Sequence, residues 1–277
     1  MFRESIKAVV CIVLIGAAFG ITDAKNNKKH YKSEFGQDKF LNEVLFKGKP
    51  NGVFLDIGAH DGVTGSNTWF CEKKLNWTGI CFEPIEDLFE KLSKNRNCIC
   101  VQGAVADKDG MATFRQVIPG PGRSSEMLSG IETLFDPRAI QRIETEIQEN
   151  GGSYKLIHVP TYELTKILSK HNINHIDFLS LDIEGGELEV LKTIDFKKFY
   201  IAAIAVENNY KMPEIRSFLE SKGFRYITML TVDEIYINKN ETFDASKMQG
   251  LSQDTKSKSD GREKRKKERK KNHKNKH

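Results

Sequence analysis

Closely spaced glycines follow an acidic residue in the segment VFLDIGAHDG, residues Val53–Gly62. Asp56 ends a short apolar run, and Gly58, Ala59 and Gly62 come after it. Glycine allows sharp turns and lets the backbone approach a ligand where a Cβ atom would collide. The spacing D-x-G-x-x-x-G differs from the G-x-G-x-x-G pattern that cradles a pyrophosphate. We therefore predict a loop for a nucleotide cofactor that needs no pyrophosphate site, with a structural strand–turn–helix junction as the alternative.

Two further apolar runs place a carboxylate and small residues where a nucleoside would lie. The run GICFEP reaches Glu83, and a carboxylate at the end of a second strand can accept hydrogen bonds from both ribose hydroxyls. An ordinary solvated strand end is the alternative interpretation of Glu83. The run Ile99–Val105 contains Gly103 and Ala104, which are small enough to pack closely against an adenine ring. Ala104 and Val105 are therefore predicted cofactor contacts.

Two more apolar runs also end in acidic residues. Ile176–Leu181 is followed by Asp182 and Glu184, and Ile201–Val206 is followed by Glu207. Helix-period segments separate most of the five runs, which is typical of an α/β fold with a doubly wound, mainly parallel sheet. Because the carboxyl ends of parallel strands meet at one edge, the acidic residues are predicted to converge there. Glu184 has an alternative role, which is to stabilise the start of the helix that follows it.

A long segment, residues 116–160, separates the third run from the fourth. It exceeds a simple connector and predicts a lid, a substrate wall or a subdomain. Asp136 and Pro137 supply a cap and a first-turn proline, so they predict the start of a helix. The preceding PGPGRSSEMLSG is rich in hydroxyl groups and is predicted to close over an acceptor, with Ser129 and Gly130 near the site. A plain surface loop is the alternative.

Four separated blocks resemble the FkbM-type methyltransferases and together cover roughly residues 35–237. They are FGQDKFL, FLDIGAHDGVTGSNT with WFCEKKLNWTGICFEP, IPGPGRSSEMLSGI, and IDFLSLDIEGGELEVLKTIDF. The resemblance implies the class I methyltransferase fold, an α/β fold with a doubly wound, mainly parallel seven-stranded sheet. The segment Phe224–Ile237 predicts an antiparallel hairpin with its turn near residues 231–234, and such a pair closes the sheet in that fold.

The resemblance also implies S-adenosylmethionine as methyl donor and a hydroxyl of a sugar, polyketide, glycan or other small molecule as acceptor. The cofactor-binding residues would be Asp56, Gly58, Ala59, Gly62, Glu83, Ala104 and Val105. A base near the methyl group would assist, because the hydroxyl must lose its proton. Asp182 or Glu184 is the first choice for this base, Glu207 the second and His60 the third.

His60 stands where this family more often has Asn, and it has an alternative role as a loop donor to backbone carbonyls. No metal site is predicted, since the C-x-C at residues 98–100 has no second Cys or His pair nearby. Cys11 lies in the amino-terminal segment, which leaves four other cysteines with three possible full pairings. Cys81 and Cys100 are predicted in core strands, so buried thiols are the alternative to disulfides.

The amino-terminal sequence indicates the cellular compartment of the protein. Arg3 and Lys7 precede an apolar run of 14 residues, Ala8–Ile21, which is short for a membrane span and typical of a secretory signal peptide. We predict a signal peptide or signal anchor over residues 1–24, so the protein would be secreted or membrane-anchored. Two sequons, beginning at Asn76 and Asn240, would be available to lumenal glycosylation.

The remaining boundaries are a polar linker over residues 25–34, an FkbM-type domain over residues 35–243 and a disordered basic tail over residues 244–277. Residues 256–277 hold 12 Lys and Arg against 3 Asp and Glu, so within a total charge of +5 the preceding chain sums to −4. Such a tail predicts binding to a polyanion, a heparan-like glycan or an anionic lipid, and a secretory route disfavours nucleic acid. A solvated tail without a partner is the alternative.

The predicted compartment and the predicted chemistry conflict, because S-adenosylmethionine is made in the cytosol. The chain also has a distant likeness to the Star-type proteins, which are membrane-anchored trafficking or export factors that retain the methyltransferase fold. The alternative function is therefore a non-catalytic protein that acts in secretory trafficking or binds cargo or glycans.

Overall fold

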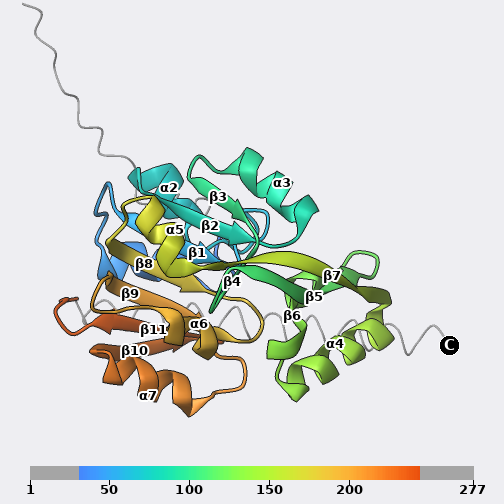
Figure 1. The fold of residues 1–277 in the computed structure, drawn as a ribbon. Coiled ribbons are helices and arrows are strands. Elements are labelled where there is room, and N and C mark those ends of the chain that lie inside the picture. The colour runs from blue at the N-terminus through green and yellow to red at the C-terminus, as the bar shows by residue number, and fades with distance from the viewer. Residues whose placement is uncertain (1–30, 244–277) are drawn as a thin grey trace, which may run out of the picture. The chain divides into compact units, whose positions relative to one another are not determined.

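The computed structural model describes residues 31–243, which contain two β-sheets and seven α-helices (Figure 1). The predicted signal segment over residues 1–24, the first part of the linker and the basic tail over residues 244–277 lie outside the described residues. None of the helices within residues 31–243 is long and apolar enough to span a membrane.

The larger sheet has seven strands in the order β10-β11-β9-β8-β1-β2-β3. These strands are β1 (Val53–Ile57), β2 (Thr78–Glu83), β3 (Ile99–Gln102), β8 (His175–Leu181), β9 (Tyr200–Glu207), β10 (Phe224–Leu230) and β11 (Asp233–Asn238). The five strands from β9 to β3 are parallel, and β11 pairs antiparallel with both β9 and β10. The prediction of a mainly parallel seven-stranded sheet with a closing hairpin is confirmed.

Helices cover both faces of this sheet. The side chains on both faces of its strands are therefore buried, which fits their apolar sequences. The helices are α1 (Gln37–Phe40), α2 (Trp69–Leu75), α3 (Glu86–Asn95), α5 (Leu164–Lys170), α6 (Glu187–Thr193) and α7 (Pro213–Ser221), with a short π-helical turn at Leu41–Leu45. On β1, Leu55 and Ile57 pack with α5, α6 and α7, whereas Phe54 packs with α1 and α2. The alternating side chains of β1 therefore bury two separate apolar clusters.

A second, four-stranded sheet has the order β4-β7-β5-β6. It consists of β4 (Ala104–Ala106), β5 (Gly110–Pro119), β6 (Gly130–Ile131) and β7 (Gly152–Glu163). Helix α4 (Pro137–Asn150) packs on it through Ile143, which contacts Val117 and Leu128. The prediction of a helix start at Asp136 is confirmed, since its side chain accepts a hydrogen bond from the backbone nitrogen of Arg138 at 2.8 Å.

The prediction of one continuous strand over Ile99–Val105 is wrong. The chain leaves the larger sheet after β3, turns at Gly103 and enters the second sheet as β4. Gly103 has a φ of 149°, and a Cβ atom there would lie 2.6 Å from the ring of Tyr162 and 2.7 Å from the carbonyl oxygen of Pro160. Only glycine fits this close approach of β7, so the apolar run is divided between two sheets.

Candidate functional site

A cavity of about 520 Å³ opens at the carboxyl ends of the parallel strands. Most of the residues predicted for the site line it: Asp56, Gly58, Ala59, His60, Glu83, Ala104, Val105, Asp182, Glu184 and Glu207. The predicted convergence of strand-end acids at one edge is therefore confirmed. The second sheet also reaches the cavity, because Phe114 and Ile131 belong to its wall.

Gly62 is the one predicted cofactor residue that does not line the cavity, and its role is corrected. A Cβ atom at Gly62 would lie 2.7 Å from both Arg96 and Leu92, so the glycine is required by packing against the end of α3. Gly58 lines the cavity but has a structural requirement too. A Cβ atom there would lie 1.8 Å from the carbonyl oxygen of Asp182, which locks the loop after β1 against the loop after β8.

Glu83 organises the backbone on two sides of the cavity. One carboxylate oxygen accepts from the backbone nitrogen of Ile85 at 2.8 Å, and the other accepts from that of His60 at 3.0 Å. Burial raises the pKa of Glu83 to about 7, and these two hydrogen bonds oppose the increase. Because each carboxylate oxygen has two lone pairs, the side chain can still accept hydrogen bonds from a ligand's hydroxyls.

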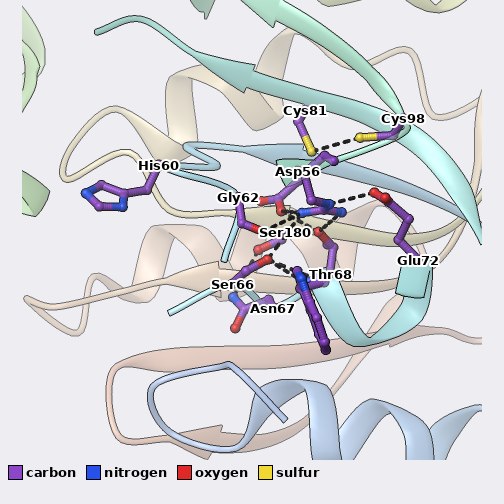
Figure 2. A network of polar contacts seen from close by, with 12 residues as sticks. Asp56, His60, Gly62, Ser66, Asn67, Thr68, Glu72, Cys81, Cys98 and Ser180 are labelled. Atoms are coloured by element: carbon purple, nitrogen blue, oxygen red, sulfur yellow. Dashed lines mark hydrogen bonds and ion pairs between the residues drawn. The ribbon is translucent and has the colours of Figure 1, made fainter. Parts of the chain in front are cut away.

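Asp56 belongs to a buried polar network with Thr68, Ser66 and Glu72 (Figure 2). Its Oδ2 atom accepts from Thr68 Oγ1 at 2.5 Å and lies 3.9 Å from Nη1 of Arg96. Burial raises the pKa of Asp56, and the guanidinium of Arg96 opposes this. Asp56 lines the cavity, so its carboxylate can also accept a hydrogen bond from a ligand there.

Arg96 is the central residue of this network, and the sequence analysis missed it. Its side chain is fully buried and donates from Nε to Glu72 at 2.6 Å, from Nη2 to Thr68 at 2.9 Å and from Nη1 to the carbonyl oxygen of Gly62 at 3.3 Å. A single arginine after a helix gives no sequence signal. Only the tertiary structure shows that it joins the glycine loop to α2.

Three carboxylates gather after β8 and β9. One oxygen from each of Asp182, Glu184 and Glu207 lies within 4.8 Å of the others. Because two negative charges at this separation repel each other, a proton on one member of the pair Asp182 and Glu207 is favoured. Nη1 of Arg142, from α4, lies 3.1 Å from Glu184. Such a group can receive a proton from a substrate, and its oxygen ligands are also of the kind that bind Mg²⁺ or Ca²⁺.

The three carboxyl groups differ in acidity. Loss of surrounding water raises the pKa of Asp182 to about 6, although the interaction with the neighbouring Glu207 side chain opposes this. Burial raises the pKa of Glu184 to about 8 despite the nearby Arg142. The pKa of Glu207 is raised well above its ordinary value by burial and then by Asp182 and Glu184. The pKa of Asp182 is therefore raised less than those of the other two carboxyl groups.

His60 faces the cavity without the partners predicted for it. Its ring nitrogens make no hydrogen bonds, and they lie 3.6 Å from Asp61 Oδ1 and 3.7 Å from Glu126 Oε1. The alternative role as a donor to backbone carbonyls is therefore wrong. Glu126 lies in a short helical turn, Ser125–Leu128, so the segment before α4 does reach the cavity as predicted. The hydroxyl of Ser129 donates within that turn to the carbonyl oxygen of Glu126 at 2.6 Å.

The four cysteines of the described residues are free thiols. Of the possible pairs, Cys81 and Cys98 have sulfur atoms 3.5 Å apart, beside the network around Asp56 (Figure 2). Cys71 is fully buried in the apolar cluster beneath α2. The alternative interpretation of buried thiols therefore holds for Cys81, whereas Cys100, on β3, is only partly buried.

Comparison with known proteins identifies relatives over this part of the chain. The family model described as the methyltransferase FkbM domain matches residues 56–226. The methyltransferase sdnD of Sordaria araneosa is 25% identical over 194 residues, and the match covers 63% of this chain and 74% of sdnD. The family match spans every residue that was predicted for the site.

Replacing Arg96 should destabilise the fold strongly. The substitution Arg96→Met leaves Asp56 buried without its cation and leaves Glu72 with only Lys73, at 2.8 Å. The free energy of unfolding should therefore fall by about 3 kcal/mol or more in urea denaturation. Arg115→Met is the matched control, because its partner Glu132 is 27% exposed and can regain water. Equal losses in the two variants would contradict the central role of Arg96.

The stability of the protein should fall as the pH rises. Glu184 has a folded-state pKa of about 8 against an ordinary value of 4.5, so the folded state holds its proton over a range where the unfolded state has lost it. The stabilisation is complete below the ordinary pKa and is lost as the pH rises through the folded value.

Urea denaturation at a series of pH values checks this. Glu184→Gln should lose less stability than the wild type between about pH 5 and about pH 9, because it removes one group of raised pKa. Glu90→Gln, at a side chain that is 63% exposed, should behave like the wild type. If the stability of Glu184→Gln fell with pH as steeply as that of the wild type, the assigned protonation of Glu184 would be ruled out.

Proposed function

The chain belongs to the FkbM methyltransferase family, and on this basis we propose that it transfers a methyl group from S-adenosylmethionine to a hydroxyl oxygen. The acceptor is a sugar, a glycan or another small molecule of the secretory pathway. The observation that carries this proposal is the single cavity at the ends of β1, β2 and β8. Carboxylates for a nucleoside and for a proton lie in that cavity together.

The residues of the cavity fit the methyl donor. Glu83, at the end of β2, has lone pairs for the ribose hydroxyls. The carboxylate of Asp56, which also lines the cavity, can accept a hydrogen bond from an amino group of S-adenosylmethionine. Ala104 and Val105 form part of the wall near Glu83 and offer an apolar surface to the adenine. A volume of about 520 Å³ is within the usual range for a cofactor site.

The carboxylates after β8 and β9 supply the electrostatics of the acceptor side. When bound, S-adenosylmethionine supplies an activated methyl group on a positively charged sulfur. Asp182, if ionised near neutral pH, gives this side of the cavity a negative potential that favours such a cation. Much of the remaining work is the alignment of the acceptor oxygen with the methyl group.

We assign the base to Asp182. It opens onto the cavity, and with a pKa of about 6 it is ionised near neutral pH. Glu207 lies beside Asp182 and has a more strongly raised pKa, so it would hold a proton under the same conditions and would not compete as the base. Arg142 fixes Glu184 from the side of α4. The proton of the acceptor hydroxyl therefore moves to Asp182.

Calorimetric titration of the purified protein with S-adenosylmethionine and S-adenosylhomocysteine tests the donor site. The wild type should bind both ligands. Glu83→Gln should bind about tenfold to a hundredfold more weakly, because a hydrogen bond to a charged group contributes about 1.5–3 kcal/mol. The control Glu90→Gln should bind like the wild type. Failure of a folded wild type to bind either ligand would overturn the proposed function.

Turnover of the Asp182→Asn variant tests the base. Release of S-adenosylhomocysteine, measured with a panel of monosaccharides and glycosides as acceptors, should fall by about 10²–10⁴ in kcat. The affinity for S-adenosylhomocysteine, whose sulfur carries no charge, should be unchanged. Wild-type kcat should rise with pH through an apparent pKa near 6. Glu207→Gln, which imitates a protonated carboxyl, is the matched variant and should lose much less. Wild-type turnover by Asp182→Asn would refute the assignment.

A further inference from the structure

The two Asn-x-Thr sequons lie at the same rim of the larger sheet, which we call the amino-end rim. Asn76 directly follows α2, and Thr78 begins β2 beside Val53, the first residue of β1. Asn240 follows β11, which runs antiparallel to β9. The next residue, Glu241, accepts a hydrogen bond from Tyr200, the first residue of β9, at 2.6 Å. Both sequons therefore lie at the ends of the sheet opposite the cavity.

Both acceptor side chains are on the surface. Asn76 and Thr78 are exposed, and so are Asn240 and Thr242. Asn76 donates from Nδ2 to Asn51 Oδ1 at 2.6 Å, whereas the side chain of Asn240 makes no hydrogen bond within residues 31–243. A glycan on Nδ2 leaves one N–H on that nitrogen, so Asn76 can keep its contact with Asn51 after modification.

We propose that Asn76 and Asn240 are N-glycosylated, and that their glycans cover the amino-end rim while the cavity stays open. The group transferred is an oligosaccharide from a lipid-linked oligosaccharide diphosphate. The bond from the sugar C1 to the phosphate oxygen breaks, a bond from C1 to Nδ2 forms, and the displaced amide proton leaves with the lipid diphosphate. The modification requires that residues 1–24 direct the chain into the lumen.

Expression of the full chain in a eukaryotic cell, followed by digestion with peptide N-glycosidase F, tests the proposal. On a denaturing gel, digestion should increase the mobility of the wild type by two steps, one for each glycan removed. Thr78→Ala and Thr242→Ala should each remove one step, because each destroys a sequon without changing the asparagine. The matched variants Thr78→Ser and Thr242→Ser retain the sequons and should retain the steps.

A wild type that does not shift after digestion would overturn the proposal, as would a chain recovered outside the lumen in a protease-protection assay. The double variant Thr78→Ala/Thr242→Ala should bind S-adenosylhomocysteine like the wild type, since both sequons lie away from the cavity. Weaker binding by this folded variant would contradict the placement of the glycans. The gel result does not depend on methyl transfer, so this proposal and the proposed function can fail separately.

Discussion

The buried guanidinium of Arg96 is the interaction on which the rest of the site depends. A charge removed from water is costly unless it is paired and hydrogen-bonded. Here the cation meets the carboxylates of Asp56 and Glu72, the hydroxyl of Thr68 and the backbone of Gly62. These partners come from β1, α2 and the loop between them. One side chain from the end of α3 thereby fixes the floor of the cavity.

The opposite wall of the cavity differs, because its carboxyl groups outnumber the cations that could pair with them. Arg142 contacts Glu184, while Asp182, Glu207 and Asp233 repel one another. The wall is stable only because some of these groups hold protons, which separates the acidities of neighbouring carboxyls. One residue can then be charged beside another that is neutral, which is what proton transfer at constant pH requires.

The sequence predicted the larger sheet well because its signal is local. Each apolar run that ends in an acid became a parallel strand, and the parallel arrangement brought Asp182 and Glu207 together. Signals that depend on distant contacts were missed. Gly103 was assigned to a strand because its crowding by β7 cannot be seen in the sequence. Residues 116–160 were predicted to form a lid, a substrate wall or a subdomain, but not a sheet that begins earlier, at β4 and β5. The exposed face of β7 carries apolar residues, including Leu156, that break a simple alternation.

The contact between Gly58 and the carbonyl of Asp182 has a consequence for how this fold can diversify. The donor loop and the loop after β8 share a backbone contact that admits no Cβ atom, so neither loop can be reshaped without the other. The segment before α4 approaches the same cavity through side chains such as Glu126 and Arg123. New acceptor specificities can therefore arise in that segment by single substitutions or changes in length, while the loops after β1 and β8 remain as an inherited unit.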